Sequence, residues 1–328
     1  MNYKVSVITP CYNSENTIDR SIESVFNQHY ENTELIVVND GSTDSSEEKI
    51  LAWKEKFEQN NMELKYIYQE NKGSGGAINT GLKSVTGEFL MLLDADDEFL
   101  DGAISKRIEY LDKHPNCNVV RSNGWIVRGD QKFLFVYEDK EKTNKDVFSM
   151  LLRAETNNWA GSYMIRTWVL FDFYKDREIF TSRSGQNLQM LLPVTYKNES
   201  GFIDEPLMNY IQQENSLSQI KSSPQEELKR KLENADGYKE IREYLVDKII
   251  EDSAEKAEAS KLINQGYWHL ILALALEYKQ SELADKAVEN LKKLEYFGES
   301  EKIMYYNFKN PTKAIFIRAV SKIKRMIK

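Results

Sequence analysis

The chain has 328 residues, of which 41% are hydrophobic and 29% are charged, and its formal net charge is -8. This length allows one large domain or two ordinary domains with an ample core. A general nucleic-acid-binding protein normally has a basic face, so the acidic balance argues against a nucleic-acid partner. Cys11 and Cys117 have neither a CxxC nor a Cys/His spacing, which indicates a reduced protein without a structural zinc site.

The chain begins with MNYKVSVITP, a strand-like run without the basic and apolar regions of a signal peptide. The longest apolar stretch, residues 267–278, is shorter than the roughly 20 residues that a membrane-spanning helix needs. We therefore expect a cytoplasmic protein in which this stretch forms a buried helix.

Strand and helix patterns alternate through the first hundred residues. Short runs rich in β-branched and apolar residues predict strands at 4–9, 34–40, 64–69 and 88–94. Apolar residues at helical spacing, or capping residues before such a pattern, predict helices at 14–28, 41–59 and 75–85. This alternation is typical of βαβ units and predicts a mainly parallel sheet flanked by helices.

The middle of the chain predicts further strands and helices in a less regular order. We expect helices at 101–114, 146–154 and 185–197, and strands with a turn within 118–138. From about residue 224 the composition changes to Lys, Glu, Ala and Leu at helical period. The sequence therefore predicts an α/β domain over residues 1–220 and a helical C-terminal region over residues 221–328.

Polar loops follow all four strands predicted in the first hundred residues. Their sequences are TPCYNSE, NDGSTD, QENKGSGG and DADD, in that order. Because ligands bind at the carboxyl ends of the strands in an open parallel sheet, we expect these loops to converge on one site.

The loop DADD contains Asp94, Asp96 and Asp97, whose carboxylates repel one another unless a cation or hydrogen-bond donors neutralise them. Hard oxygen ligands without a His or Cys partner suit Mg²⁺ or Mn²⁺. The alternative is a solvated turn whose acids cap the next helix, since short acidic motifs also match by chance.

Two other loops allow different interpretations. Asp40 ends an apolar strand at the edge where a base or ribose would lie, and its carboxylate can accept two hydrogen bonds. The stretch NKGSGGAIN matches neither GxGxxG nor a Walker A motif. Its glycines favour a tight turn and close packing of a short helix.

Taken together, residues 5 to about 99 resemble the family 2 glycosyltransferases of the GT-A fold, a Rossmann-like architecture. Members of that family are inverting enzymes that take sugars from nucleotide-diphosphate donors. The resemblance implies that Asp94 and Asp96 bind a divalent metal, Mn²⁺ or Mg²⁺, on the diphosphate. It implies that the following residues bind the nucleotide sugar: Thr9, Pro10, Tyr12, Glu15, Asp40, Asp94, Ala95 and Asp96.

The sequence departs from the family pattern at two places. Ile78 stands where many relatives have an arginine, which removes one positive contact near the donor. Gln186 and Asn187 stand where much of the family has the acid that serves as base, and an amide cannot accept that proton. Asp97 is the nearest alternative acid, so Asp97 and Gln186 are the candidate catalytic residues.

The segment GQNLQMLLP resembles a variant that recurs among relatives that build surface polysaccharides. The resemblance implies transfer from a UDP-sugar to a glycan or lipid-linked acceptor, in capsule or O-antigen biosynthesis. The alternative is a catalytically impaired nucleotide-sugar-binding or scaffold subunit of a polysaccharide assembly complex. Trp159 and Tyr163 are candidates for an acceptor-stacking face, although large aromatic residues more often belong to a core.

The last eighteen residues, 311–328, carry six basic residues and no acid. At helical spacing, apolar and basic residues separate onto two faces. Such a helix can lie on an anionic membrane surface, here the inner face of the cell membrane, or pack on the protein with solvated lysines.

Overall fold

The computed structural model of the protein describes residues 3–181, 185–212 and 223–310. Its contacts divide the chain into two compact units. The first comprises Met1–Leu151, Glu155–Ile220 and Asp247–Ile249, and the second comprises Leu152–Ala154, Lys221–Val246 and Ile250–Lys328. The predicted division at residue 220 differs from these units at two places, because it assigns Leu152–Ala154 to the first domain and Asp247–Ile249 to the second.

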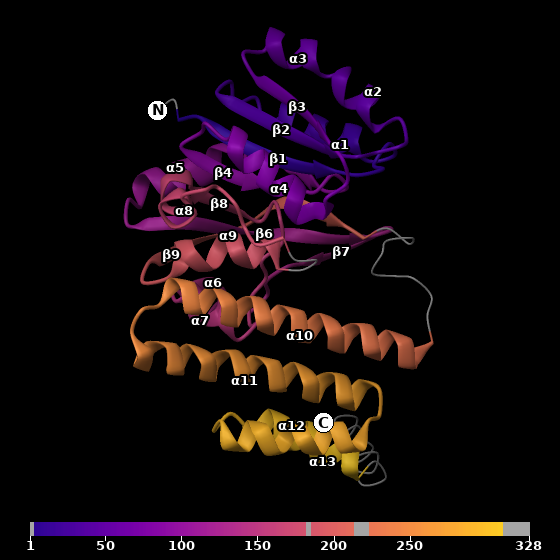
Figure 1. Ribbon diagram of the computed structural model, residues 1–328, viewed down its shortest axis with the longest axis vertical. Helices are drawn as coiled ribbons and strands as arrows, with labels where there is room; N and C mark the ends of the chain where they lie inside the picture. The colour runs from indigo at the N-terminus through magenta and orange to yellow at the C-terminus, as the bar shows by residue number, and fades with distance from the viewer. Residues whose placement is uncertain (1–2, 182–184, 213–222, 311–328) are drawn as a thin grey trace, which may run out of the picture. The chain divides into compact units, whose positions relative to one another are not determined.

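The first unit is built on one mixed sheet in the order β3-β2-β1-β4-β8-β6-β9-β5, with β7 paired to β6 (Figure 1). The pairs β1–β2, β2–β3, β1–β4 and β6–β9 are parallel, and the other pairs are antiparallel. The strands are β1 Val5–Cys11, β2 Thr33–Asp40, β3 Glu63–Gln69, β4 Phe89–Leu92, β5 Glu98–Phe99, β6 Cys117–Arg128, β7 Gln131–Leu134, β8 Tyr163–Arg166 and β9 Glu199–Ile211.

Helices of the first unit cover this sheet, and α4 packs on β1 and β2. All eight residues of β2 are buried, as expected for a central parallel strand that is covered on both faces. These helices are α1 Ile18–Phe26, α2 Ser46–Leu51, α3 Lys54–Gln59, α4 Gly73–Ser84, α5 Ser105–Lys113, α6 Asp139–Thr143, α7 Val147–Leu152, α8 Thr167–Phe173 and α9 Gln186–Thr195.

The predicted fold class is confirmed, with differences in detail. The single helix predicted over 41–59 is divided into α2 and α3 at Ala52 and Trp53, where the Trp53 indole donates to Asp19 Oδ1 (3.1 Å). The strands β5, β8 and β9 were not predicted. The strands β5 and β8 have only two and four residues, which carry too little periodic pattern. Strand β9 has thirteen residues, but Gly201 and Pro206 interrupt its strand pattern.

The second unit is helical, as predicted. It contains α10 Pro224–Ile249 up to Val246, and the whole of α11 Ser253–Glu277, α12 Ser281–Lys293 and α13 Glu299–Lys309. Its core includes Ile271, Leu272 and Ala275 from the apolar stretch 267–278, which therefore lies in a partly buried helix. Within the described ranges, no helix is both long and apolar enough to cross a membrane.

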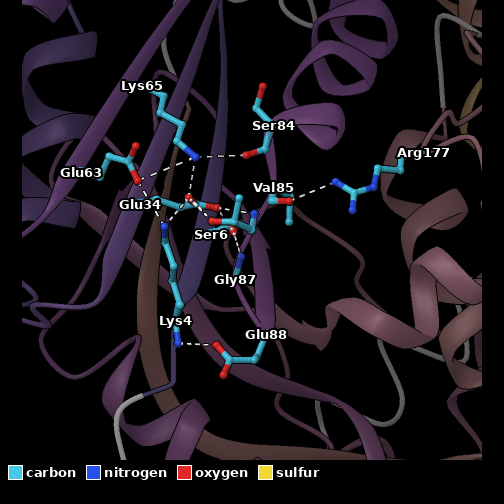
Figure 2. Close-up of polar contacts among 11 residues, drawn as sticks. Lys4, Ser6, Glu34, Glu63, Lys65, Ser84, Val85, Gly87, Glu88 and Arg177 are labelled. Atoms are coloured by element: carbon cyan, nitrogen blue, oxygen red, sulfur yellow. Dashed lines mark hydrogen bonds and ion pairs between the residues drawn. The ribbon is translucent and has the colours of Figure 1, made fainter.

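A buried carboxylate, Glu34, holds together the amino ends of several strands (Figure 2). Its oxygens accept hydrogen bonds from Thr86 N (2.7 Å), Thr86 Oγ1 (2.6 Å), Lys65 Nζ (2.7 Å) and the Ser6 hydroxyl. Lys4 Nζ lies 2.9 Å from Glu34 Oε2 and forms an ion pair with it. Burial alone would raise the pKa of Glu34, but the hydrogen bonds from Lys65, Ser6 and Thr86 outweigh it and lower the pKa to about 2.

The same network fixes the end of α4 at Ser84 and the connection to β4, residues 85–88. Its further bonds are Lys65 Nζ to Ser84 O (3.2 Å), Arg177 Nη1 to Val85 O (3.1 Å), Gly87 N to Ser6 Oγ (2.9 Å) and Lys4 N to Glu88 Oε2 (2.6 Å) (Figure 2). A Cβ on Gly87 would lie 2.7 Å from Lys4 O and from Ser6 N, so only glycine fits there. Because β4 has only four residues, this anchor sets the position of the acidic loop that follows it.

Candidate active site

A cleft of about 640 Å³ opens at the carboxyl ends of β1, β2, β3 and β4. The loops after all four strands contribute to it, as the sequence predicts. The lining residues are Pro10, Cys11, Tyr12, Asn13, Ser14, Asn16, Thr17, Asp40, Asn71, Gly73, Ser74, Ala77, Asp94, Ala95 and Asp96.

The cleft is lined by acidic but not by basic side chains. Asp40, Asp94 and Asp96 are among its lining residues, and none of the lining residues is Lys, Arg or His. Burial and the charge of Asp96 raise the pKa of Asp94 to about 6, and burial also raises the pKa of Asp96. A cation in the cleft would relieve this repulsion, whereas an anionic ligand alone would increase it.

The donor set fits a hard divalent ion. Asp94 and Asp96 offer carboxylate oxygens, which suit Mg²⁺ or Mn²⁺. In the part of the chain that the structure describes, no group of three or more His, Cys, Asp or Glu side chains could hold a metal ion. Among the described residues, Asp94 and Asp96 would hold the ion, and water and substrate phosphates would contribute to its coordination, as is usual for Mg²⁺.

Helix α1 holds the backbone of the acidic loop in place. Arg20 Nη2 donates to Asp96 O (2.6 Å), and Ser21 Oγ donates to Asp94 O (3.2 Å). Arg20 Nε also lies 3.5 Å from Glu98 Oε2. These bonds fix the loop through its carbonyl groups rather than through the carboxylates that face the cleft.

Asp40, the last residue of β2, lines the cleft and is 3% exposed. Its Oδ1 accepts hydrogen bonds from Gln69 Nε2 (2.6 Å) and from Lys72 N (2.8 Å). The sequence predicted Asp40 but not Gln69. The parallel register that pairs these two strand ends is the signal that could have revealed Gln69.

The predicted residues of the loop after β1 fall into two groups. Pro10 and Tyr12 line the cleft, and the Tyr12 side chain is 52% exposed. Thr9 and Glu15 are not among the lining residues. Thr9 is buried, and Glu15 Oε2 accepts a hydrogen bond from Ser45 N (3.1 Å), which ties this loop to the loop after β2.

Ile78 is 3% exposed and belongs to the core, while its neighbour Ala77 lines the cleft. The position at which many relatives have an arginine therefore offers no charge to a ligand. This placement agrees with the departure noted in the sequence.

The candidate base position at the start of α9 is occupied by amides. Asn187 Oδ1 accepts a hydrogen bond from the Tyr163 hydroxyl (2.6 Å), and neither Gln186 nor Asn187 lines the cleft. Tyr163 is fully buried, and burial together with the charge of Asp94 raises its pKa. Tyr163 therefore has no exposed face for an acceptor sugar, and the predicted stacking role does not fit its burial.

Asp97 is 1% exposed and is not among the residues that line the cleft. Its Oδ1 accepts a hydrogen bond from Ile211 N of β9 (2.8 Å), while its buried Oδ2 has no hydrogen-bond partner. Burial and the charges of Asp94 and Asp96 raise its pKa well above the ordinary value. In this conformation Asp97 links the acidic loop to β9 and is not exposed to the cleft.

Trp159, the other candidate for the acceptor, belongs to an aromatic cluster. Its ring stacks on Tyr210 of β9, with 5.2 Å between centroids and an interplanar angle of 2°, and meets Phe135 edge to face at 4.4 Å. Tyr210, which the sequence did not suggest, is adjacent to the residue that binds Asp97. Trp159 is only partly buried, so it stays the candidate for contact with an acceptor.

Residues 6–180 match the model of glycosyl transferase family 2, and because this is more than half of the chain, the chain belongs to that family. Among curated relatives, the uncharacterized glycosyltransferase RT0329 of Rickettsia typhi is 36% identical over 153 residues, which are 45% of this chain and 46% of that protein. The chain thus spans about half of the length of this relative.

A second relative is UDP-Glc:alpha-D-GlcNAc-diphosphoundecaprenol beta-1,3-glucosyltransferase WfgD of Escherichia coli. It is 39% identical over 130 residues, which are 39% of this chain and 49% of that protein. The match therefore covers about half of that relative as well.

Two solved structures share the fold. Residues 1–349 of S. aureus TarS in complex with UDP-GlcNAc have a TM-score of 0.62 at 17% identity, over 95% of this chain and 92% of that chain. The mannosyltransferase PcManGT of Pyrobaculum calidifontis, in complex with GDP-Man and Mn²⁺, has a TM-score of 0.57 at 17% identity, over 98% and 80% of the two chains. At this identity the likeness supports the GT-A fold alone.

Proposed function

We propose that the chain transfers a sugar, with inversion, from a UDP-sugar to a glycan or lipid-linked acceptor in cell-surface polysaccharide biosynthesis. The observation that carries this proposal is the cleft that unites Asp40 with Asp94 and Asp96 and has no basic lining residue. Such a cleft favours a diphosphate only together with a divalent ion. Capsule and O-antigen assembly are the expected settings.

The proposed roles follow from the placement of each residue. Pro10, Tyr12 and Asp40 bind the nucleoside, while Thr9 and Glu15 support the loops around it. Asp94 and Asp96 would hold Mn²⁺ or Mg²⁺, which when bound neutralises the charge that develops on the departing nucleotide. Ala95 between them lines the same wall of the cleft.

The relatives support the donor and acceptor classes. WfgD is named for a UDP-glucose donor and a diphosphoundecaprenol-linked acceptor, and TarS was solved with UDP-GlcNAc. A lipid-linked acceptor and a UDP-sugar are accordingly the first substrates to test.

The alternative is a nucleotide-sugar-binding subunit with impaired catalysis. The amides at Gln186 and Asn187, and the burial of Asp97 against β9, favour it because none of these groups is placed to take a proton from an acceptor. Donor turnover separates the two functions. Released UDP in the presence of acceptor supports the transferase, whereas tight binding without release supports the subunit.

The decisive experiment combines a panel of nucleotide sugars with Mn²⁺ and measures thermal shift and released nucleotide. The native chain is compared with Asp96→Asn and with the control Asp101→Asn, an exposed acid outside the cleft. We expect Asp96→Asn to lose both responses and Asp101→Asn to keep them. If both variants respond like the native chain, the assignment fails.

We also propose that residues 1–220 form the catalytic domain and that residues 221–328 form a helical domain in a cytoplasmic protein. The basic segment 311–328 lies outside the described residues, and we propose that it binds the inner face of the cell membrane. Deleting it should lower sedimentation with anionic vesicles. Equal sedimentation of the truncated and full-length chains would exclude this role.

A further inference from the structure

We propose that Gln69, oriented by Thr80, makes Asp40 selective for a uracil base over guanine. This inference rests on the proposed function, because it assumes that the nucleotide base lies at Asp40. The fold itself leaves the base open, since one structural neighbour was solved with UDP-GlcNAc and another with GDP-Man.

The selectivity begins with the position of two strand ends. Asp40 and Gln69 are the last residues of the parallel strands β2 and β3 and are partners in their register. Both side chains are buried, and Gln69 Nε2 donates to Asp40 Oδ1 over 2.6 Å. The Thr80 hydroxyl of α4 donates to Gln69 Oε1, so the amide is held with its nitrogen toward Asp40.

A second donor reaches the same oxygen because the backbone packs closely here. Lys72 N donates to Asp40 Oδ1 over 2.8 Å. Gly41 has φ +77°, and a Cβ there would lie 2.9 Å from Asn71 N. The loop after β3 can therefore lie directly against Gly41, which brings Lys72 N within reach of Asp40.

The two donors make the two carboxylate oxygens of Asp40 differ in how many further hydrogen bonds each can accept. Oδ1 already accepts two hydrogen bonds, which uses its two lone pairs. Only Oδ2 therefore has its full capacity to accept a hydrogen bond from a ligand. Asp40 thus presents one strong acceptor to the cleft rather than a pair.

This single acceptor matches uracil better than guanine. Uracil offers one ring N–H between two carbonyl groups, whereas guanine offers two adjacent N–H groups that need both oxygens of a carboxylate. The donors on Oδ1 also reduce its repulsion of the uracil carbonyl beside the ring N–H. Cytosine and adenine present an unprotonated ring nitrogen at the same edge, which a carboxylate repels.

The test measures the dissociation constants of UDP, GDP, CDP and ADP for the full-length protein by calorimetry with Mn²⁺. The native chain should bind UDP about tenfold or more tightly than GDP, the factor expected for a hydrogen bond to a charged group. The readout is the ratio of the dissociation constant of GDP to that of UDP. In Gln69→Leu this ratio should fall toward one. Thr80→Val, which removes only the donor that orients the amide, should lower the ratio less.

Gln59→Leu, the same change at an exposed glutamine of α3, is the matched control and should leave the ratio unchanged. The ratio is the informative readout, because a purely structural defect would weaken UDP and GDP alike. Equal affinity of the native chain for UDP and GDP overturns the inference and leaves the proposed function standing. Should Gln69→Leu fail to fold, an unchanged ratio in Thr80→Val overturns it. Absence of binding by every nucleotide with Mn²⁺ overturns the proposed function itself.

Discussion

Acidic side chains lie at both ends of the parallel strands, but in opposite electrostatic states. At the amino ends, Glu34 is fully buried, receives four hydrogen bonds and has a lowered pKa. At the carboxyl ends, Asp94 and Asp96 crowd together beside a cleft without a basic lining residue, and their pKa values are raised. Hydrogen bonds and an ion pair within the fold compensate the charge of Glu34, which therefore stabilises the fold. The raised pKa values of Asp94 and Asp96 instead indicate a functional site that binds a cation.

The largest stability effect is expected from Glu34→Ala. The substitution leaves Lys65 without its buried partner and Thr86 N without an acceptor, and breaking a buried charged network costs about 3–5 kcal/mol. Urea unfolding of the variant measures this loss. A loss below about 1 kcal/mol would show that Glu34 is not the anchor of the connection before β4.

The pH dependence of unfolding tests the same residue without breaking its packing. Folding lowers the pKa of Glu34 from 4.5 to about 2, so its contribution is complete above about pH 4.5 and is lost as the pH falls toward 2. The difference corresponds to about 3 kcal/mol. The control Glu34→Gln should have a flatter profile of unfolding free energy over this window. Parallel profiles for the two proteins would contradict the lowered pKa.

At the opposite edge, Asp96→Asn should weaken binding of UDP with Mn²⁺ about 100-fold or more, because even residues that only support a metal ligand cost 10- to 100-fold. Its melting temperature without ligand should equal or exceed that of the native chain, since one repelling charge is removed. Calorimetry and thermal melting measure the two quantities. If Asp96→Asn melted at a lower temperature and still bound UDP with Mn²⁺ as tightly as the native chain, Asp96 would stabilise the fold rather than bind the metal.

The smallest effect concerns Asp94, whose side chain is partly exposed. Folding raises its pKa from 3.8 to about 6, so the chain without metal should lose stability as the pH rises from about 4 to 6. Asp94→Asn should reduce this loss, and the raised pKa values of Asp96 and Asp97 account for the part that remains. Mn²⁺ with UDP should also reduce the loss in the native chain. A loss of the same size in Asp94→Asn would assign it to another group.

The sequence predicts those features of the fold and of the site that depend on local sequence pattern. Alternating strand and helix patterns indicate the parallel half of the sheet, and polar loops after its strands identify Asp40 and the acidic loop. The bonds to Glu34 come from β1, β3 and the connection after α4, so no local pattern within TELIVVND reveals them.

The same reason explains why the sequence did not suggest Gln69 and why the stacking role predicted for Tyr163 does not fit the structure. Gln69 acts through Asp40 and Thr80, which belong to other elements of the fold. Tyr163 matches the pattern of a stacking aromatic, but only the structure reveals that it is buried against Asn187.

The most direct test of the central claim is anomalous diffraction at the manganese edge from crystals grown with UDP and Mn²⁺. The account predicts one strong peak in the cleft, within bonding distance of an Asp96 or Asp94 carboxylate oxygen and of the UDP diphosphate. A nucleotide bound in the cleft with no peak at the acidic loop, or a peak elsewhere, would contradict it.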